Sequence, residues 1–244
     1  MKDLLTVIVP AAGEGKRLGL GKNKAFAEIC GMPLLVLCMR MLAGTKMVRR
    51  AIVVVGAAEI AETEAMLTAY RSRCFPDMDW QVTAGGRERQ DSVANGLALV
   101  TDREGYVAVH DGARPFAGRG VFARTLAKAK QCGAAVAAVP LKDTVKVKDA
   151  GGFVVSTPDR ASLCAVQTPQ IFEVNVLRNA YDFLKEHPFA VTDDASLAEA
   201  FGNPVAVAEG SYDNIKVTTP EDLLLAEKIW EKLNRPEQKD FTVE

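Results

Sequence analysis

The stretch that decides the fold runs from residue 4 to residue 24 and reads LLTVIVPAAGEGKRLGLGKNK. Residues 4–10 are apolar and rich in β-branched side chains, which is typical of a strand buried on both faces. The glycine-rich remainder carries the basic side chains of Lys16, Arg17, Lys22 and Lys24. A strand that leads into a glycine-rich turn presents backbone N–H groups to an anion, so this stretch predicts a phosphate site.

Two standard phosphate-binding loops do not fit this stretch. The dinucleotide fingerprint would begin at Gly13, but Leu18 stands where its third glycine belongs. The Walker pattern needs a glycine where Lys16 stands and a Ser or Thr where Asn23 stands. The loop alone therefore leaves two interpretations open, another kind of triphosphate site or a flexible turn with solvated lysines.

Apolar runs alternate with amphipathic stretches along the rest of the chain. We expect strands at residues 4–10, 51–55, 80–83, 106–110 and 134–140, and helices at 33–42, 58–70, 91–100, 120–131, 174–186, 194–201 and 220–233. This rhythm predicts a Rossmann-like α/β fold, a mainly parallel sheet with helices on both faces. We expect one domain over residues 1–236 and a polar tail at 237–244.

One region interrupts this rhythm. Residues 144–148 alternate with period two, residues 149–152 form a turn, and an apolar run follows at 153–155. This pattern predicts a β-hairpin, part of an arm at about residues 139–160. A two-stranded hairpin alone is marginal in water, so it should pack on a second subunit or on its own domain.

Composition excludes several classes of protein. The net charge of −1 argues against a general nucleic-acid or anionic-membrane surface. The five cysteines are scattered without a C-x-x-C pair, so a zinc site or a disulfide framework is not expected. The chain shows no membrane-spanning run and no secretory signal, which favours a cytoplasmic protein without a membrane partner.

Other polar segments follow predicted strands or open helices. Asp111 and Arg114 come after the fourth strand and should lie beside the first loop, although Asp111 could serve a turn, and His110 should be packed in the core. Ser92 could bond a base or ribose, or it and Asp91 could cap a helix. Five later segments, taken singly, have the chemistry of turns or surfaces: residues 142–146, 157–160, 167–170, 192–196 and 213–219.

Together, in this order, these segments resemble the 2-C-methyl-D-erythritol 4-phosphate cytidylyltransferase family over nearly the whole chain. The family's A-A-G-x-G-x-R opening matches residues 11–17, with the following lysine at Lys24. Its other motifs match G-G at 85–86, D-S-V at 91–93, H-D-x-A-R-P at 110–115, D-T-x-K at 143–146, D-R at 159–160, T-P-Q at 168–170, T-D-D-A-S at 192–196 and N-I-K-V-T-x-P-E-D at 214–222. The chain departs from the family at Asn23, where some members have Pro, and at Gly112, where many have Ala.

The resemblance implies a reaction and residue roles. The phosphate of methylerythritol phosphate attacks the α-phosphorus of CTP, pyrophosphate leaves, and catalysis rests on alignment and charge neutralisation. The implied catalytic residues are Arg17, Lys24, Arg160 and Lys216. The implied nucleotide-binding residues are Ala11, Ala12, Gly13, Gly15, Gly85, Gly86, Asp91, Ser92 and Asp111. The implied contacts to the attacking substrate are Asp111, Arg114, Thr144, Arg160, Thr168 and Lys216.

The resemblance also implies a metal and a second subunit. Mg²⁺ is expected to bind mainly through the CTP phosphates, without dedicated protein ligands. The arm is expected to swap over the neighbouring subunit of a homodimer and to complete the substrate site there. Three other functions stay open: transfer to another polyol phosphate such as ribitol 5-phosphate, nucleotide binding without catalysis, and dinucleotide-dependent oxidoreduction, against which Leu18 argues.

Overall fold

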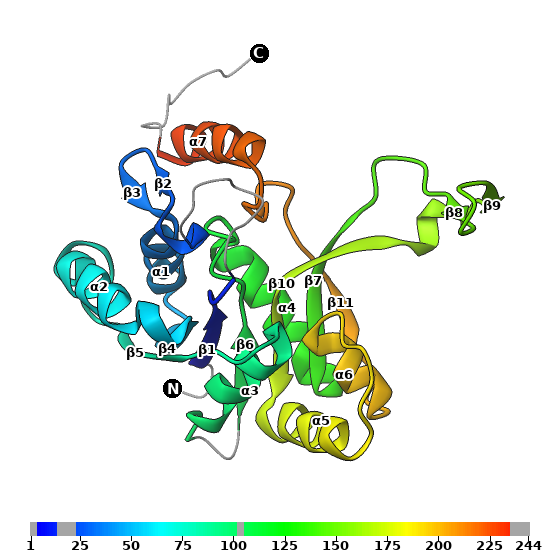
Figure 1. Cartoon of the computed structure of the whole chain (residues 1–244), viewed down its shortest axis with the longest axis horizontal. Helices are drawn as coiled ribbons and strands as arrows, with labels where there is room; N and C mark the ends of the chain where they lie inside the picture. The colour runs from blue at the N-terminus through cyan, green and yellow to red at the C-terminus, as the bar shows by residue number, and fades with distance from the viewer. Residues whose placement is uncertain (1–3, 14–22, 102–104, 235–244) are drawn as a thin grey trace, which may run out of the picture.

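The computed structural model describes residues 4–13, 23–101 and 105–234 and is built around one seven-stranded sheet (Figure 1). The strand order is β11-β7-β10-β6-β1-β4-β5. The strands span Leu5–Pro10 (β1), Val48–Val55 (β4), Asp79–Ala84 (β5), Tyr106–Val109 (β6), Ala134–Pro140 (β7), Cys164–Glu173 (β10) and Ala206–Glu209 (β11). Only β10 runs antiparallel to its neighbours within this sheet. The predicted mainly parallel α/β fold is confirmed.

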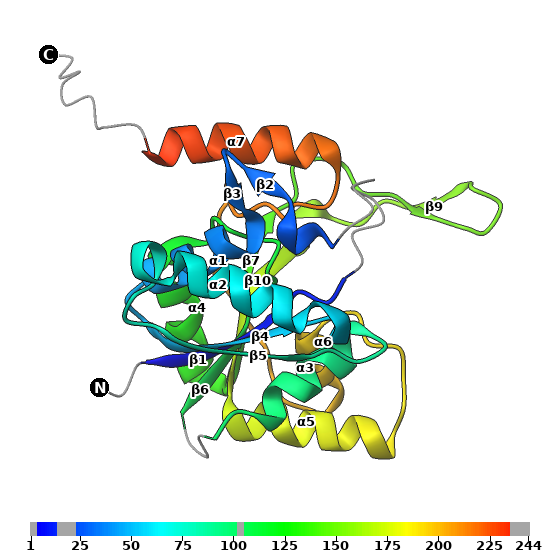
Figure 2. The ribbon, with the colours of Figure 1, turned by 60° about the vertical axis from the view of Figure 1, so that its left-hand side comes forward.

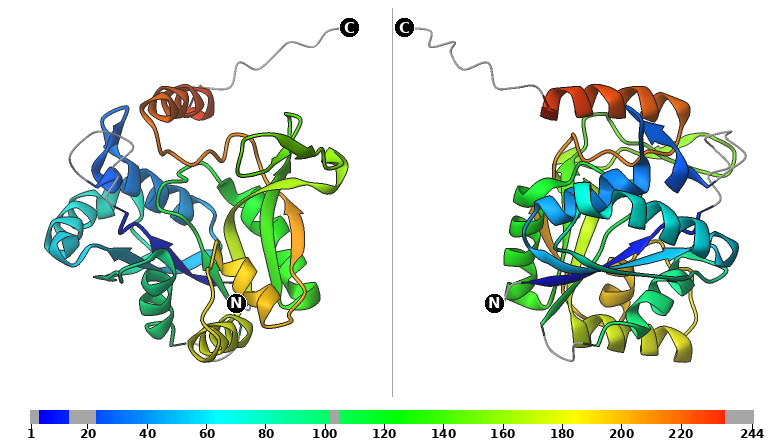
Figure 3. Two further views of the ribbon diagram at one scale, coloured as in Figure 1. Left: turned by 45° about the vertical axis from the view of Figure 1, so that its right-hand side comes forward. Right: turned by 90° about the vertical axis from the view of Figure 1, so that its left-hand side faces the viewer.

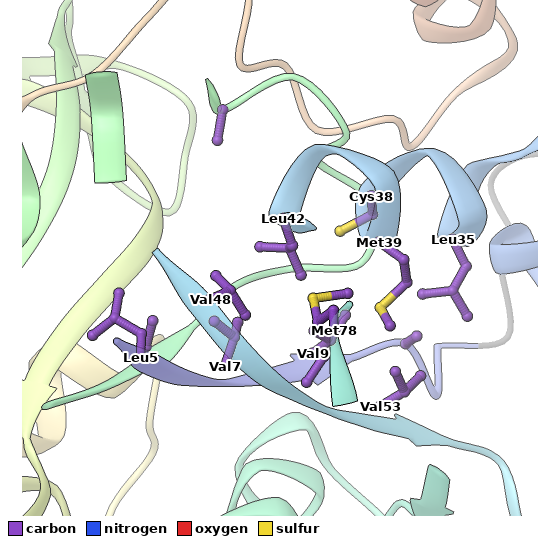
Figure 4. Close-up of a cluster of buried hydrophobic side chains, with 14 of the residues drawn as sticks. Leu5, Val7, Val9, Leu35, Cys38, Met39, Leu42, Val48, Val53 and Met78 are labelled. Carbon is purple, nitrogen blue, oxygen red and sulfur yellow. The ribbon is translucent and has the colours of Figure 1, made fainter. Parts of the chain in front are cut away.

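Helices cover both faces of the sheet, as Figure 2 shows. On one face lie α1 (Leu34–Gly44), α2 (Ile60–Cys74) and α4 (Gly118–Cys132), and on the other lie α3 (Arg89–Ala98), α5 (Val174–Glu186) and α6 (Asp194–Ala200). Successive residues of β1 supply both layers, because Val7 and Val9 pack with the first set and Ile8 with the second. Figure 4 shows the first layer, where Leu42 and Met39 of α1 lie above Val7 and Val9 of β1.

A third layer covers the outer side of α1. The short strands β2 (Glu28–Ile29) and β3 (Met32–Pro33) pair with each other, and α7 (Pro220–Asn234) lies beside them. Ile229 of α7 packs with Ile29 and Leu34 in a separate apolar cluster. Figure 3 shows α7 at the end of the molecule opposite α5. This layer keeps the segment before α7 next to the ends of the central strands.

The arm projects from the domain in Figures 1 and 2. Its hairpin pairs β8 (Val147–Lys148) with β9 (Val154–Ser156), which makes it shorter than the sequence pattern predicts. Phe153 is 74% exposed, and Val154 and Val155 are also exposed. The hairpin is therefore confirmed, whereas packing of these side chains on the same domain is not seen among the described residues.

Strand β10 was not predicted. Gln167, Thr168 and Gln170, which we expected in a turn or at the surface, are buried in it. Pro169 lacks the N–H that a ladder needs, and the register with β7 shifts between Val166 and Gln170. Pro169 therefore makes this central strand hard to recognise from the sequence. The short edge strand β11 was missed as well.

No helix in the described ranges is long and apolar enough to cross a membrane.

Candidate functional site

A pocket of about 320 Å³ opens at the carboxyl ends of β1, β5 and β6. Parallel α/β sheets bind ligands at this edge. Its lining comes from segments far apart in the sequence and consists of Pro10, Ala11, Ala12, Gly13, Lys24, Gly86, Arg87, Glu88, Arg89, Ser92, Asp111, Ala113 and Lys216. The sheet thus brings together two predicted charges, Lys24 and Lys216, that lie almost the whole chain apart.

The glycine pair at 85–86 allows the loop after β5 to approach β1. A Cβ atom on Gly85 would lie 2.8 Å from the Cβ of Ala12 and 2.8 Å from the Oγ of Ser92, so only glycine fits. Ser92 Oγ donates to the carbonyl of Glu88 and accepts from the N–H of Gly86. This buried hydroxyl therefore shapes the loop that forms the pocket wall.

The start of α3 shows which of the two predicted cap residues, Asp91 and Ser92, caps the helix. Glu88 is the N-cap residue, and the carboxylate of Asp91 accepts its backbone N–H at 3.0 Å. Asp91 is accordingly a capping residue at the third helical position. It is not among the residues that line the pocket.

Strand β1 ends at Pro10, and the structure describes the first loop up to Gly13 and again from Asn23. Gly15 and Arg17, two of the predicted site residues, lie outside the described residues. The amide of Asn23 is buried and donates to the carbonyl of Ala11 (2.8 Å) and to the carboxylate of Glu59 (2.7 Å). Its carbonyl accepts from the N–H of Ala25. Asn23 therefore connects the segment after β1 to the backbone beside Lys24.

Asp111 is a buried carboxylate in contact with three cations. It lies 2.8 Å from the Nζ of Lys216, 3.6 Å from Arg89 and 3.7 Å from Arg114. Burial opposes the charge of Asp111, but Lys216 and the two guanidinium groups outweigh it and hold the pKa well below its usual range. Asp111 stays ionised and fixes the ammonium group of Lys216 at the pocket.

Thr168 and His110 hold Asp111 from behind. The N–H of Asp111 donates to Thr168 Oγ1 at 3.0 Å, and that oxygen lies 3.2 Å from His110 Nδ1. His110 Nε2 lies 2.8 Å from the carbonyl of Arg114, which can only accept, so Nε2 carries the proton and Nδ1 accepts from Thr168. Burial lowers the pKa of His110 to about 4. The predicted packed histidine is confirmed, and Thr168 acts as a support of Asp111.

Arg114 lies beside the pocket and is mostly buried. Its Nη1 donates to the carbonyl of Asn214 at 2.7 Å, which connects the end of β6 to the segment carrying Lys216. Burial lowers the pKa of Arg114, although the carboxylate of Asp111 opposes this shift. Arg114 is absent from the pocket lining, so its predicted contact with the attacking substrate is not visible within one chain.

Arg160 and Thr144 do not join the pocket. Arg160 begins the short helix η4 (Arg160–Ser162) at the base of the arm and donates to the carbonyl of Lys142. It lines a separate cavity of about 660 Å³ with residues of β7 and β11. Thr144 is exposed on the arm. One chain therefore brings Lys24 and Lys216 together but leaves these two predicted residues elsewhere.

Sequence reasoning missed Arg89 and the two residues behind it. Arg89 lines the pocket, and its Nη1 lies 2.8 Å from the fully buried carboxylate of Asp194. Tyr181 donates to the same carboxylate at 2.8 Å. The T-D-D-A-S segment at 192–196 was the available signal, but nothing in the sequence connects it with residue 89.

The chain is similar to known proteins of one family over nearly its whole length. A family model described as IspD, 2-C-methyl-D-erythritol 4-phosphate cytidylyltransferase, matches residues 5–232. The chain is 47% identical to the protein of that name from Bacillus mycoides, over 93% of this chain and 97% of the relative. The corresponding protein of Geobacillus kaustophilus is 45% identical over 91% and 95%.

Solved structures give the same result. The 4-diphosphocytidyl-2C-methyl-D-erythritol synthase of Anaerococcus prevotii superposes with a TM-score of 0.81 at 29% identity, covering 95% of this chain and all of that one. The 2-C-methyl-D-erythritol 4-phosphate cytidylyltransferase of Thermus thermophilus has a TM-score of 0.73 at 32% identity, covering 93% and 98%. The similarity therefore extends over the whole fold, including the strands that form the pocket.

Proposed function

The chain belongs to the 2-C-methyl-D-erythritol 4-phosphate cytidylyltransferase family, and from that premise we propose how its own residues carry out the reaction. It is a CTP-dependent nucleotidyltransferase that makes 4-diphosphocytidyl-2-C-methyl-D-erythritol in isoprenoid biosynthesis. The phosphate of the polyol attacks the α-phosphorus of CTP, and pyrophosphate leaves. The observation that carries the assignment of roles is the pocket that joins Lys24 to Lys216 across the strand ends.

We assign CTP to the part of the pocket formed by residues 11–13, 86 and 92. The backbone of this part approaches closely because Gly85 carries no side chain, and its polar groups can read the edge of a base. Ser92 supports this wall, and Asp91 supports the helix start beyond it. Gly15 is assigned to the triphosphate from the sequence resemblance.

Lys24 is assigned to the growing negative charge on the α-phosphate and the leaving pyrophosphate. It lines the pocket at the point where the first loop returns to β1. A cation that is already in place stabilises charge that appears only in the transition state. Arg17 is assigned the same role by resemblance, and its guanidinium suits forked contact with phosphate oxygens.

Lys216 is assigned to the attacking phosphate. Its ammonium group is fixed by Asp111, so it can hold an oxyanion near the nucleotide without searching for a position. Arg114 and Thr168 act through Asp111 and the segment around Asn214. The charge pairs exist before substrate arrives, which fits an enzyme whose task is to align two anions.

Magnesium fits this pocket as an ion carried by the nucleotide. Within the described residues, no three His, Cys, Asp or Glu side chains are grouped so that they could hold a metal. The pocket carboxylate Asp111 already faces three cations. Mg²⁺ commonly keeps several waters and binds through substrate phosphates. When bound, it would neutralise phosphate charge, and Asp111 and Glu88 are the carboxylates of the pocket lining that could approach its hydration shell.

We propose that the active enzyme is a homodimer in which the arm of one subunit completes the pocket of the other. Arg160 and Thr144 lie on or beside the arm and outside the pocket of their own chain. The exposed apolar side chains near β9 need a surface to cover them. A partner's arm would bring Arg160 to the attacking phosphate opposite Lys216.

We also place the enzyme in the cytoplasm. All five cysteines are free, which suits a reducing compartment. The substrates are charged, water-soluble metabolites. Nothing in this proposal requires a nucleic acid or a membrane.

A pyrophosphate-release assay tests the reaction and its selectivity together. The purified protein, with Mg²⁺, is given CTP and either methylerythritol phosphate, ribitol 5-phosphate or erythritol phosphate. We expect release with the first acceptor far above the others, and loss of release when ATP, GTP or UTP replaces CTP. A preference for ribitol 5-phosphate, or release without any acceptor, would contradict the assigned reaction.

A further inference from the structure

Arg89 stands between two carboxylates, one in the pocket and one behind it. Its Nη1 is 2.8 Å from Asp194 Oδ2, and its Nη2 is 3.6 Å from Asp111 Oδ1. The Arg89 side chain is 31% exposed and lines the pocket, whereas the Asp194 side chain is completely buried. Asp194 thus attracts the guanidinium from the side away from the pocket, where the substrates cannot reach.

Asp194 is held firmly by its surroundings. The hydroxyl of Tyr181 donates to Asp194 Oδ1 at 2.8 Å. Burial and the charge of Asp194 raise the pKa of Tyr181, so its hydroxyl stays protonated and remains a donor. Gln170 of β10 accepts from the N–H of Ala195 and donates to Asp193, which fixes the start of α6 to the central sheet. Tyr181 holds the carboxylate of Asp194, and Gln170 holds the backbone beside it, so Asp194 can serve as a fixed reference for Arg89.

The position of Arg89 decides how the charge of Asp111 is shared. Asp111 faces Lys216 at 2.8 Å, while the closer partner of Arg89 is Asp194. If Asp194 lost its charge, the nearest carboxylate left to Arg89 would be Asp111. The guanidinium would then leave its place beside Asp194, move toward Asp111 in the pocket, and compete with Lys216.

We propose that Asp194, supported by Tyr181, is a positioning residue that holds the Arg89 guanidinium at the wall of the nucleotide pocket and leaves Asp111 to Lys216. Arg89 itself is a binding residue for the polar part of the nucleotide next to residues 86–92. The proposal rests on the assignment of this pocket to CTP. It adds three residues from α3, α5 and α6 to the machinery of the reaction.

The test measures binding of CTP with Mg²⁺ by calorimetry, without the second substrate. Asp194→Asn keeps the shape of the side chain and an acceptor for Tyr181 but removes the charge. We expect the dissociation constant for CTP to rise about tenfold, the size expected for weakening a hydrogen bond to a charged group. Asp182→Asn is the matched control, since Asp182 of α5 forms only an exposed pair with Lys185 in the same region.

A double-variant cycle separates positioning from general loss of structure. Arg89→Lys keeps the charge but cannot contact two carboxylates in the same way. If Asp194 acts through Arg89, the Arg89→Lys/Asp194→Asn protein binds CTP about as well as Arg89→Lys alone, since coupled residues are not additive. If the two effects multiply, or if Asp194→Asn binds CTP like wild type, the proposal is overturned.

Tyr181→Phe keeps the test decisive if Asp194→Asn does not fold. It removes one hydrogen bond and no charge, so we expect weaker CTP binding by about threefold and a KM for methylerythritol phosphate near the wild-type value. Unchanged CTP binding in Tyr181→Phe would contradict the proposal. A wild-type protein that fails to bind CTP would instead reject the assignment of the pocket, which distinguishes the two failures.

Discussion

The pocket and the arm are both built on the central sheet. They differ in how many of the contacts around their side chains a single chain supplies. In the pocket, Asp111 is buried, and Lys216, Arg89 and Arg114 surround it. On the arm, Phe153 is 74% exposed, and the guanidinium of Arg160 contacts only a backbone carbonyl among the hydrogen bonds seen in the described residues. Under the proposed function, this difference fits a nucleotide side that one chain prepares and an acceptor side that has Lys216 in place and still lacks Arg160.

The largest effect should come from the charge in the pocket. We expect Lys24→Ala to lower turnover by about 10²-fold or more, because it removes a cation placed for the transition state. Lys128→Ala is the control, since Lys128 is exposed on α4. Steady-state pyrophosphate release gives the comparison. Near-normal turnover of Lys24→Ala would show that the pocket charge is not used in this way.

The buried histidine makes the pocket region sensitive to acid. The pKa of His110 is lowered to about 4 by burial, so between about pH 6.5 and pH 4 the unfolded chain takes up a proton that the folded chain refuses. Stability therefore falls as pH falls through this range, by up to ~3 kcal/mol from this residue. The depressed pKa of Asp111 adds stability that is kept in this range and lost only at lower pH.

Urea unfolding at several pH values measures this effect. His110→Asn should unfold more easily at neutral pH but lose less stability on acidification. His187→Gln, at an exposed position, should keep the wild-type slope. An equal slope in His110→Asn and wild type would show that His110 is not held neutral by the fold.

The arm should respond to a charge at its apolar side chains. We expect Phe153→Asp to shift the protein from dimer to monomer and to raise the KM for methylerythritol phosphate about tenfold or more, because a buried contact is replaced by a charge. Binding of CTP should stay unchanged. Phe189→Asp, another partly exposed phenylalanine, is the control. A protein that is monomeric by solution scattering and fully active would contradict the two-chain site.

The smallest effect concerns the closure of the first loop. Asn23→Ala removes the contacts to Ala11, Glu59 and Ala25, and we expect a loss of about 1–2 kcal/mol in the free energy of unfolding. Turnover should fall as well, because Lys24 follows directly. Asn203→Ala removes hydrogen bonds to Cys132 and Pro204 far from the pocket, so it should lose stability without loss of turnover per folded molecule.

Much of this arrangement is visible in the sequence, and the exceptions have physical causes. The strands 4–10 and 134–140 were predicted because their apolar runs are continuous and end at glycine or proline. Strand β10 was hidden by Pro169, although it carries the hydroxyl of Thr168 that supports Asp111. The link between Arg89 and Asp194 depends on α3 and α6 sharing one apolar layer on the same face of the sheet, which no local pattern encodes.

The most direct test of the two-chain site mixes two inactive variants. Lys24→Ala and Arg160→Ala are co-expressed with different tags, and dimers carrying both are compared with each parent. If each pocket uses the partner's Arg160, a mixed dimer has one intact site of two, so dimers that carry both tags recover about half of wild-type activity and an unselected random mixture about a quarter. Activity no higher than that of the parents would contradict the account, because it would mean that Lys24 and Arg160 act from the same chain.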